Sequence, residues 1–103
     1  MEPFFALADA TRRRIVEALS EGPLSSGEIA ARFPISAPAI SQHLKALKAA
    51  RLVRVRSEAQ RRIYEIDPEG IEAVAGWAEG VRAHWAARLD ELAAALKESD
   101  RHD

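Results

Sequence analysis

Cysteine is absent from the 103-residue sequence, and so are long apolar runs. Without a thiol the chain forms no disulfide, no thiolate metal site and no cysteine nucleophile. The longest apolar run has five residues, whereas a helix that crosses a bilayer needs about 20. The first residues also lack the basic segment and the apolar stretch of a secretory signal. We therefore expect a cytoplasmic protein that has no membrane partner.

Aromatic residues are few, at 6%, but hydrophobic residues reach 48% and charged residues 30%. These proportions are typical of globular chains and unlike those of disordered or fibrous ones. A chain of this length is too short for two full domains. We therefore expect a single domain that covers residues 1–103 and builds its own core.

The net charge of −1 hides two halves of opposite sign. Residues 1–66 hold 11 Lys and Arg against 7 Asp and Glu, whereas residues 67–103 hold 4 against 9. Within residues 36–62 a single acid, Glu58, faces seven cations: Lys45, Lys48, Arg51, Arg54, Arg56, Arg61 and Arg62. Such a segment is either an ordinary solvated surface or a basic patch that attracts a polyanion by releasing its counterions.

The first 23 residues predict two helices. Three apolar side chains near the start suit a short helix that needs cover, in the core or from another chain: Phe4, Phe5 and Leu7. Asp9 is a suitable N-cap for the second helix, because its carboxylate can accept from free backbone N–H groups. Gly22–Pro23 then provides the stop.

The next segment predicts a pair of helices joined by a short turn. Ser25 and Glu28 have the spacing of a capping box, in which hydroxyl and carboxylate satisfy free backbone donors at a helix start. Pro34 ends this short helix. Ser36 caps the following one, where Pro38 is tolerated in the first turn because its missing N–H has no intrahelical partner there.

The second helix of this pair has two unlike faces. Ile40, Leu44 and Leu47 recur at i, i+4 and i+7 and predict the buried stripe. The opposite face carries small or hydrogen-bonding side chains and one cation: Pro38, Ser41, Gln42, Lys45 and Ala49. This face lacks the dense Glu–Lys pairing of an ordinary solvent face, and it suits close approach to a polar groove.

The hydrophobic period changes to two after Leu52, which predicts a β-hairpin over residues 52–66 with a polar, basic tip at residues 57–61. Helix, short turn, helix and basic hairpin follow in the order of a winged helix-turn-helix, whose second helix enters the DNA major groove. The expected fold is therefore mainly α with a small β-hairpin. Residues 25–50 form the helix-turn-helix and residues 52–66 the wing.

Asp67 and Pro68 are expected to begin a long helix that runs to residue 99, with residues 100–103 as a frayed tail. Because glycine weakens a helix, a kink or a break at Gly76 or Gly80 is an alternative to a continuous helix. The apolar positions are nearly a heptad seam: Ile71, Val74, Ala78, Val81, Trp85, Leu89, Leu92 and Leu96.

This helix would be about 48 Å long, which exceeds the ~35 Å breadth of a domain of this size. Part of the seam must therefore project, and a second copy of the chain is its simplest cover. Packing of the whole seam within one chain is the alternative. Residues 1–8 and 68–99 are the predicted dimerisation helices, with an interface of Phe4, Phe5, Leu7, Trp77, Val81, Trp85, Leu89, Leu92 and Leu96.

Four segments of the chain resemble the ArsR family of small bacterial repressors. They are ALADATRRRI at residues 6–15, GPLSSGEIA at 22–30, SAPAISQHLK at 36–45 and the hairpin at 52–66. The resemblance implies a homodimeric winged helix that binds a palindromic operator and commonly represses its own promoter. Within the family the chain is most similar to the branch without an evident metal site. Ala10 and Ala59 depart from the pattern, which often has proline and glycine there, and Ala59 leaves the turn type open.

The resemblance assigns roles in DNA binding by position. Ser36 holds a phosphate or caps the helix, whereas Gln42 is the best base reader because glutamine pairs with adenine N6 and N7. His43, on the flank, has a structural or phosphate-contacting role. The hairpin arginines contact phosphates or enter the minor groove, unless each is merely solvated. The complete set is Ser36, Ala37, Pro38, Ser41, Gln42, His43, Lys45, Lys48, Arg54, Arg56, Arg61 and Arg62.

Metal sensing and catalysis are disfavoured. On the long helix His84 is the one candidate ligand, but Arg82 stands where a carboxylate is needed and His102 lies in the tail, so neither a metal nor another cofactor is expected. Ser41 and His43 are two positions apart and point to different sides of a helix, so no enzyme is expected. Two alternatives stay open: a protein-interaction module that uses the acidic C-terminal helix, and a metal- or ligand-gated sensor of the same fold.

Overall fold

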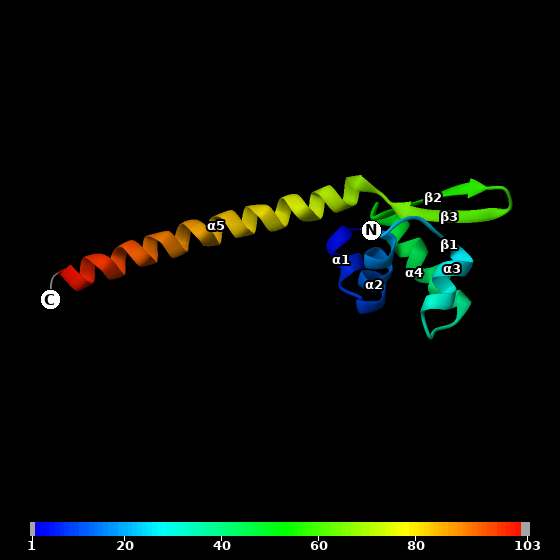
Figure 1. The fold of residues 1–103 in the computed structure, drawn as a ribbon, viewed down its shortest axis with the longest axis horizontal. Helices are drawn as coiled ribbons and strands as arrows, with labels where there is room; N and C mark the ends of the chain where they lie inside the picture. Colours follow the sequence, from blue (N-terminus) through cyan, green and yellow to red (C-terminus); the bar gives the residue numbers. More distant parts are fainter. Residues whose placement is uncertain (1, 102–103) are drawn as a thin grey trace.

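The computed structural model describes residues 2–101 as a small globular domain from which one helix projects (Figure 1), with overall extents of 73 × 26 × 24 Å. The secondary structure confirms the predicted class, mainly helical with a small antiparallel sheet. The elements in chain order are α1 (Pro3–Leu7), α2 (Ala10–Leu19), β1 (Leu24–Ser25), α3 (Ser26–Arg32), α4 (Ala37–Ala49), β2 (Val53–Glu58), β3 (Arg61–Ile66) and α5 (Pro68–Arg101).

The predicted helix caps are present. The Asp9 carboxylate accepts from the Arg12 N–H at 3.0 Å and begins α2. Ser25 and Glu28 form the complete capping box of α3. The Ser36 hydroxyl accepts from the backbone of α4 at 3.2 Å. Because each of these bonds spans three residues, the local sequence was sufficient to predict them.

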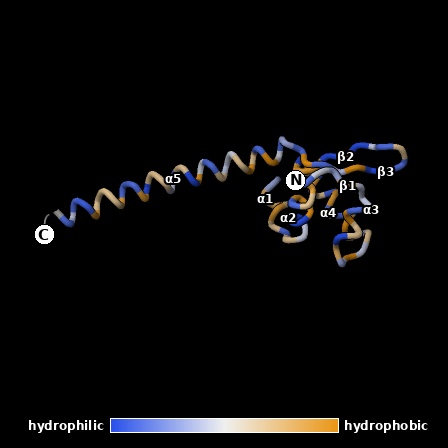
Figure 2. Tube along the Cα trace, viewed as in Figure 1, coloured by the Kyte–Doolittle hydropathy of each residue, from blue (hydrophilic) through white to orange (hydrophobic). Residues whose placement is uncertain are grey.

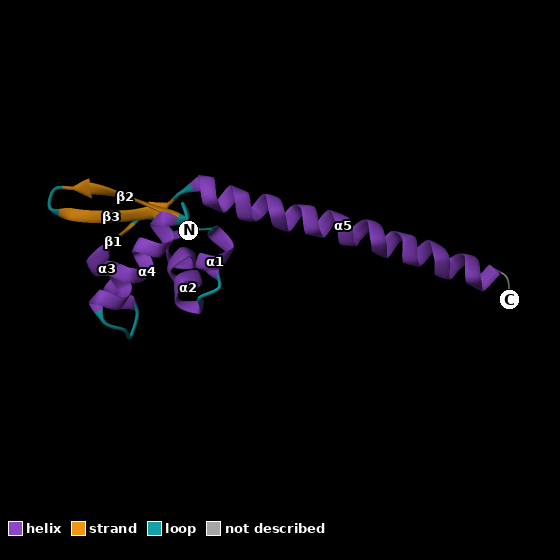
Figure 3. Cartoon of the chain, turned by 180° about the vertical axis from the view of Figure 1, so that it is seen from behind, coloured by secondary structure: helices purple, strands orange, loops and turns teal. Residues whose placement is uncertain are grey.

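The core lies where α2, α3 and α4 meet the inner face of the hairpin. Its fully buried side chains include Ile15, Ile29, Leu44, Leu47, Leu52 and Val53. Seen from behind, the helices of the domain gather on one side of the sheet, and α5 leaves on the far side from the hairpin tip (Figure 3). The helix-turn-helix pair and the wing are thus held by one continuous core.

The sheet has three strands in the order β1–β3–β2, one more than predicted. Strand β1 has two residues, and Leu24 pairs with Tyr64 in β3. So short a strand shows no periodicity and could not be inferred from the sequence. The hairpin tip is also tighter than predicted: Glu58 pairs with Arg61, and Ala59 turns the chain with a φ of 56°.

Helix α4 ends in a Schellman motif that positions the start of α5. The Leu52 N–H donates to the Leu47 carbonyl at 3.0 Å and the Arg51 N–H to the Lys48 carbonyl at 3.1 Å, with Arg51 at a φ of 59°. The Arg51 carbonyl then accepts from Gly70 at 2.9 Å. A Cβ at Gly70 would lie only 2.3 Å from that carbonyl oxygen, so glycine is required for this approach.

Helix α5 is unbroken over its 34 residues, through Gly76 and Gly80. It continues through Arg101, two residues past the expected end at 99. Residues 102–103, with His102, lie outside the described residues, as does Met1.

The first turns of α5 pack on the domain and the rest carries an uncovered apolar stripe. Ile71 and Val74 contact the core, and Trp77 meets the Phe4 ring edge-on at 5.0 Å. Beyond this point the seam alternates with polar positions along the projecting helix (Figure 2). Exposed apolar residues there are Trp77, Val81, Trp85, Leu89, Leu92 and Leu96. None of the helices in the described range 2–101 is both long and apolar enough to cross a membrane.

Candidate nucleic-acid interface

Helix α4 presents the polar face predicted for it. Ile40, Leu44 and Leu47 are at most 2% exposed and anchor the helix on the core. Because the opposite face lies about half a helical turn away, its residues are held in the solvent at fixed positions. The exposed members are Ser36, Ala37, Pro38, Ser41, Gln42, Lys45, Lys48 and Ala49.

His43 lies at the edge of this face and is half-buried. Its Nδ1 accepts a hydrogen bond from Arg12 Nε of α2 at 3.2 Å. The backbone N–H of Arg12 lowers the pKa of the Asp9 carboxyl by donating a hydrogen bond to it. The hydrogen bond between His43 and Arg12 joins α4 to α2.

Two lysines of α4 and one arginine of β3 lie together where the helix meets the hairpin. We call Lys45, Lys48 and Arg62 the cation cluster. They line a cavity of about 250 Å³ with Ser41, Leu44 and Tyr64. The Arg62 guanidinium lies 5.8 Å from the centre of the Tyr64 ring, which orients it along the strand.

The cation cluster has no carboxylate to neutralise it. In residues 2–101, none of the three side chains has a carboxylate within ion-pairing distance. Their charges therefore add to one another at the junction of α4 and the wing. An uncompensated cluster of this kind attracts an anion such as a phosphate group.

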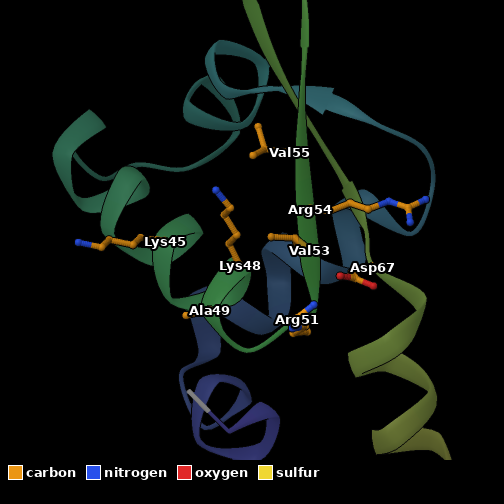
Figure 4. Close-up of a pocket in the computed structure, with 8 residues that line it drawn as sticks. All are labelled: Lys45, Lys48, Ala49, Arg51, Val53, Arg54, Val55 and Asp67. Atoms are coloured by element: carbon orange, nitrogen blue, oxygen red, sulfur yellow. The ribbon is translucent and has the colours of Figure 1, made fainter.

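The other wing arginines do not belong to this cluster. Side chains alternate between the two faces of a strand, so Arg54, Arg56 and Arg61 lie on the face opposite Arg62. Figure 4 shows Arg54 extending from β2 to the side away from Lys45 and Lys48. A groove of about 600 Å³ passes the free edge of β2 and is lined by Lys45, Lys48, Ala49, Arg51, Val53, Arg54, Val55 and Asp67.

These three arginines are paired with carboxylates of the same chain. Arg54 Nε lies 3.2 Å from Glu65, Arg56 lies 2.6 Å from Glu58, and Arg61 lies 2.8 Å from Glu28. The Glu58 hydrogen bond raises the pKa of Arg56. The pKa of Glu28 is lowered, first by the Ser25 backbone N–H and further by the charge of Arg61.

The arginines on this face of the wing are therefore paired within the domain. Residues 36–62 contain Glu58 alone, whereas Glu65 comes from the neighbouring strand and Glu28 from α3. Arg51 is paired as well, with Glu69 at 3.4 Å. A count along the chain misses such partners because they approach only in the folded domain.

The residues weighed as metal ligands do not gather. His84 lies exposed on the projecting part of α5, and its neighbour Arg82 is paired with Glu79 at 2.6 Å. Within the described part of the chain no three side chains of histidine, aspartate or glutamate form a group that could hold an ion. The side chains at the α4–wing junction are instead cations and hydrogen-bonding groups, which can bind an anion and form hydrogen bonds.

The profile described as "Bacterial regulatory protein, arsR family" matches residues 9–55. The transcriptional repressor SdpR of Bacillus subtilis is 35% identical over 72% of this chain and 82% of its own length. The chain belongs to the ArsR family. This confirms the resemblance found in the sequence, and it accounts for the winged helix-turn-helix built by α3, α4 and the hairpin.

Other relatives of this ArsR-family chain are similar over most of the domain. The HTH-type transcriptional regulator Rv2034 of Mycobacterium tuberculosis is 58% identical over 69 residues, which are 67% of this chain and 64% of Rv2034. The chain thus matches a little under two thirds of that protein's length. The solved structure of a possible transcriptional regulator for arsenical resistance superposes with a TM-score of 0.73 at 36% identity, over 91% of this chain and 95% of the other.

Proposed function

We propose that this protein is a homodimeric, sequence-specific DNA-binding repressor of transcription that acts in the cytoplasm and binds a palindromic operator, including one in its own promoter. One observation carries the proposal: the exposed polar face of α4 lies beside a cation cluster that has no carboxylate partner in the described part of the chain. Base edges need hydrogen-bonding side chains on a rigid helix, and phosphates need cations at its border. The named repressors and regulators among its relatives support the same function.

The position of each residue on α4 or the wing determines which part of the DNA it contacts in this proposal. Gln42 reads adenine through paired hydrogen bonds, and Lys45 with Ser41 reaches neighbouring base edges from the same exposed face. Lys48 and Arg62, at the border with the wing, bind phosphates and set the register. The start of α4, with Ser36, Ala37 and Pro38, approaches the backbone closely because its side chains are small, and His43 supports the helix through Arg12.

The dimer is proposed from the apolar surface that one chain leaves uncovered. Phe5 is 67% exposed on α1, and the large apolar residues of the α5 seam from Trp77 to Leu96 are 38–60% exposed. Leu7 is partly buried against its own core and Phe4 packs on Trp77, so these two offer a partner less free surface than Phe5 does. A second copy that covers this surface places two α4 helices to read half-sites about one helical turn, or 34–36 Å, apart.

Fluorescence anisotropy with two labelled duplexes tests the proposal, one from the region upstream of the protein's own gene and one scrambled. Specific binding that weakens steeply with salt is expected. Gln42→Ala should lose about 1–3 kcal/mol of discrimination between the duplexes. Lys48→Ala should weaken both alike and reduce the salt slope by about 0.9, whereas Lys97→Ala on distal α5 should do neither. Equal, weak binding of both duplexes would refute sequence-specific repression.

A further inference from the structure

Glu65 occupies an unusual place on the outer face of the wing. It stands directly opposite Arg54 in the pairing of β2 and β3. Its Oε1 is 3.2 Å from Arg54 Nε and 3.9 Å from Arg56 Nε, so one carboxylate serves two arginines. The side chain is only 26% exposed, whereas both arginines are about half exposed. The partly buried Glu65 carboxylate therefore lies within ion-pairing distance of two arginines whose side chains face the solvent.

We propose that Glu65, helped by Glu58 and Glu28, competes with DNA phosphates for the wing arginines and so limits the sequence-independent DNA affinity of this protein. The proposal rests on the DNA binding proposed above. A carboxylate and a phosphate are recognised by the same planar fork of guanidinium donors, so an arginine that holds one is not free for the other. Lys48 and Arg62 of the cation cluster, which have no carboxylate partner among residues 2–101, are left to supply the phosphate contacts.

The division of the wing into two faces gives this competition a consequence for specificity. Phosphate contacts favour every sequence alike, whereas contacts from α4 favour only the operator. If Arg54 and Arg56 were free to bind phosphates, the wing would add DNA affinity that does not depend on the base sequence. With Arg54 held by Glu65 and Arg56 held by Glu58, a larger share of the total affinity comes from the base-reading face of α4.

Of the three carboxylates, Glu65 is the one whose substitution tests the competition without disturbing a helix cap or a turn. Glu28 also caps α3, and its loss would weaken that helix. Glu58 adjoins the tight turn at Ala59. Among residues 2–101, the side chain of Glu65 contacts only the two arginines by hydrogen bond or ion pair. Glu65→Gln keeps its size and removes its charge, and Glu98→Gln makes the same change on α5, on the side away from the seam.

The experiment measures the anisotropy of the operator duplex and of a scrambled duplex of equal length from 50 to 300 mM salt. Exposed ion pairs are weak. Glu65→Gln releases Arg54 and leaves Arg56 paired with Glu58, so binding should tighten by up to about fivefold. The salt slope should become steeper by about 0.9 for each new phosphate contact. Both duplexes should gain alike, and Glu98→Gln should bind as the natural protein does.

A second pair of variants distinguishes release of the arginines from a general effect of charge. In an Arg54→Gln, Arg56→Gln background, Glu65→Gln should leave affinity and salt slope unchanged. An equal gain in that background, a gain restricted to the operator, or a Glu65→Gln result equal to that of Glu98→Gln would each overturn the inference. If the natural protein bound neither duplex, that result would instead overturn the proposed function, and this inference with it.

Discussion

Replacement of Gly70 by alanine should uncouple the long helix from the DNA-binding domain. The added Cβ would lie 2.3 Å from the Arg51 carbonyl oxygen and 2.7 Å from its carbonyl carbon, and both atoms are backbone at the end of α4. Neither can rotate away as a flexible side chain would. The first turn of α5 must therefore move and lose the Gly70 N–H bond to Arg51, which is 2.9 Å long.

The cost follows from three terms. Overpacking costs about 1–3 kcal/mol and the lost hydrogen bond about 0.5–1.5 kcal/mol, while alanine regains up to about 1 kcal/mol of helix propensity. We expect a net loss of about 2–3 kcal/mol. In a domain of this size the melting temperature should then fall by about 8–20 °C.

The assay is thermal unfolding followed by circular dichroism at one fixed protomer concentration, because dimerisation would make the midpoint concentration-dependent. Gly76→Ala is the matched control on the same helix. Nothing lies within 4 Å of a Cβ at Gly76, so this variant should be stabilised by about 1 kcal/mol. A Gly70→Ala protein as stable as the natural one would refute the close approach of α5 to α4.

Three further predictions concern the turn, the dimer and acid stability. Ala59→Gly should stabilise the hairpin by about 0.5–1 kcal/mol in urea unfolding, because glycine accepts the positive φ; a destabilised variant would contradict this. Leu92→Glu should make the protein monomeric in analytical ultracentrifugation, whereas Ala94→Glu, on the opposite side of α5, should not. The lowered pKa of Glu28 means that its stabilisation is present above pH 4.5 and is lost as the pH falls below that value. Glu28→Gln should therefore flatten the acid limb of a stability–pH profile, and an unchanged limb would count against the capping role.

Features that depend on neighbours in the chain can be inferred from the order of the amino acids alone. The caps at Asp9, Ser25 and Ser36 use a side chain and a backbone donor three residues apart, so the local order of residues contains all that is needed. The buried stripe of α4 and the start of the long helix after Asp67 follow from short-range periodicity and from helix-start residues. Together these signals predicted the winged helix-turn-helix and the polar face of α4.

Features that join distant segments required the folded domain. Strand β1 exists only through its pairing with β3, and the need for glycine at position 70 arises from the end of α4. The bond between His43 and Arg12 joins residues 31 positions apart. No local pattern encodes such contacts, because their free energy depends on which surfaces the core brings together.

The charge of the wing shows this division most clearly. Composition showed seven cations in residues 36–62. The pairing of β2 with β3 places Arg62 on the opposite face from Arg54 and Arg56. Folding then placed Glu65 and Glu28 against one face of the wing and left the cation cluster on the other face uncompensated. Electrostatic interaction depends on distance in space, so the number of charges is a property of the chain and their balance is a property of the fold.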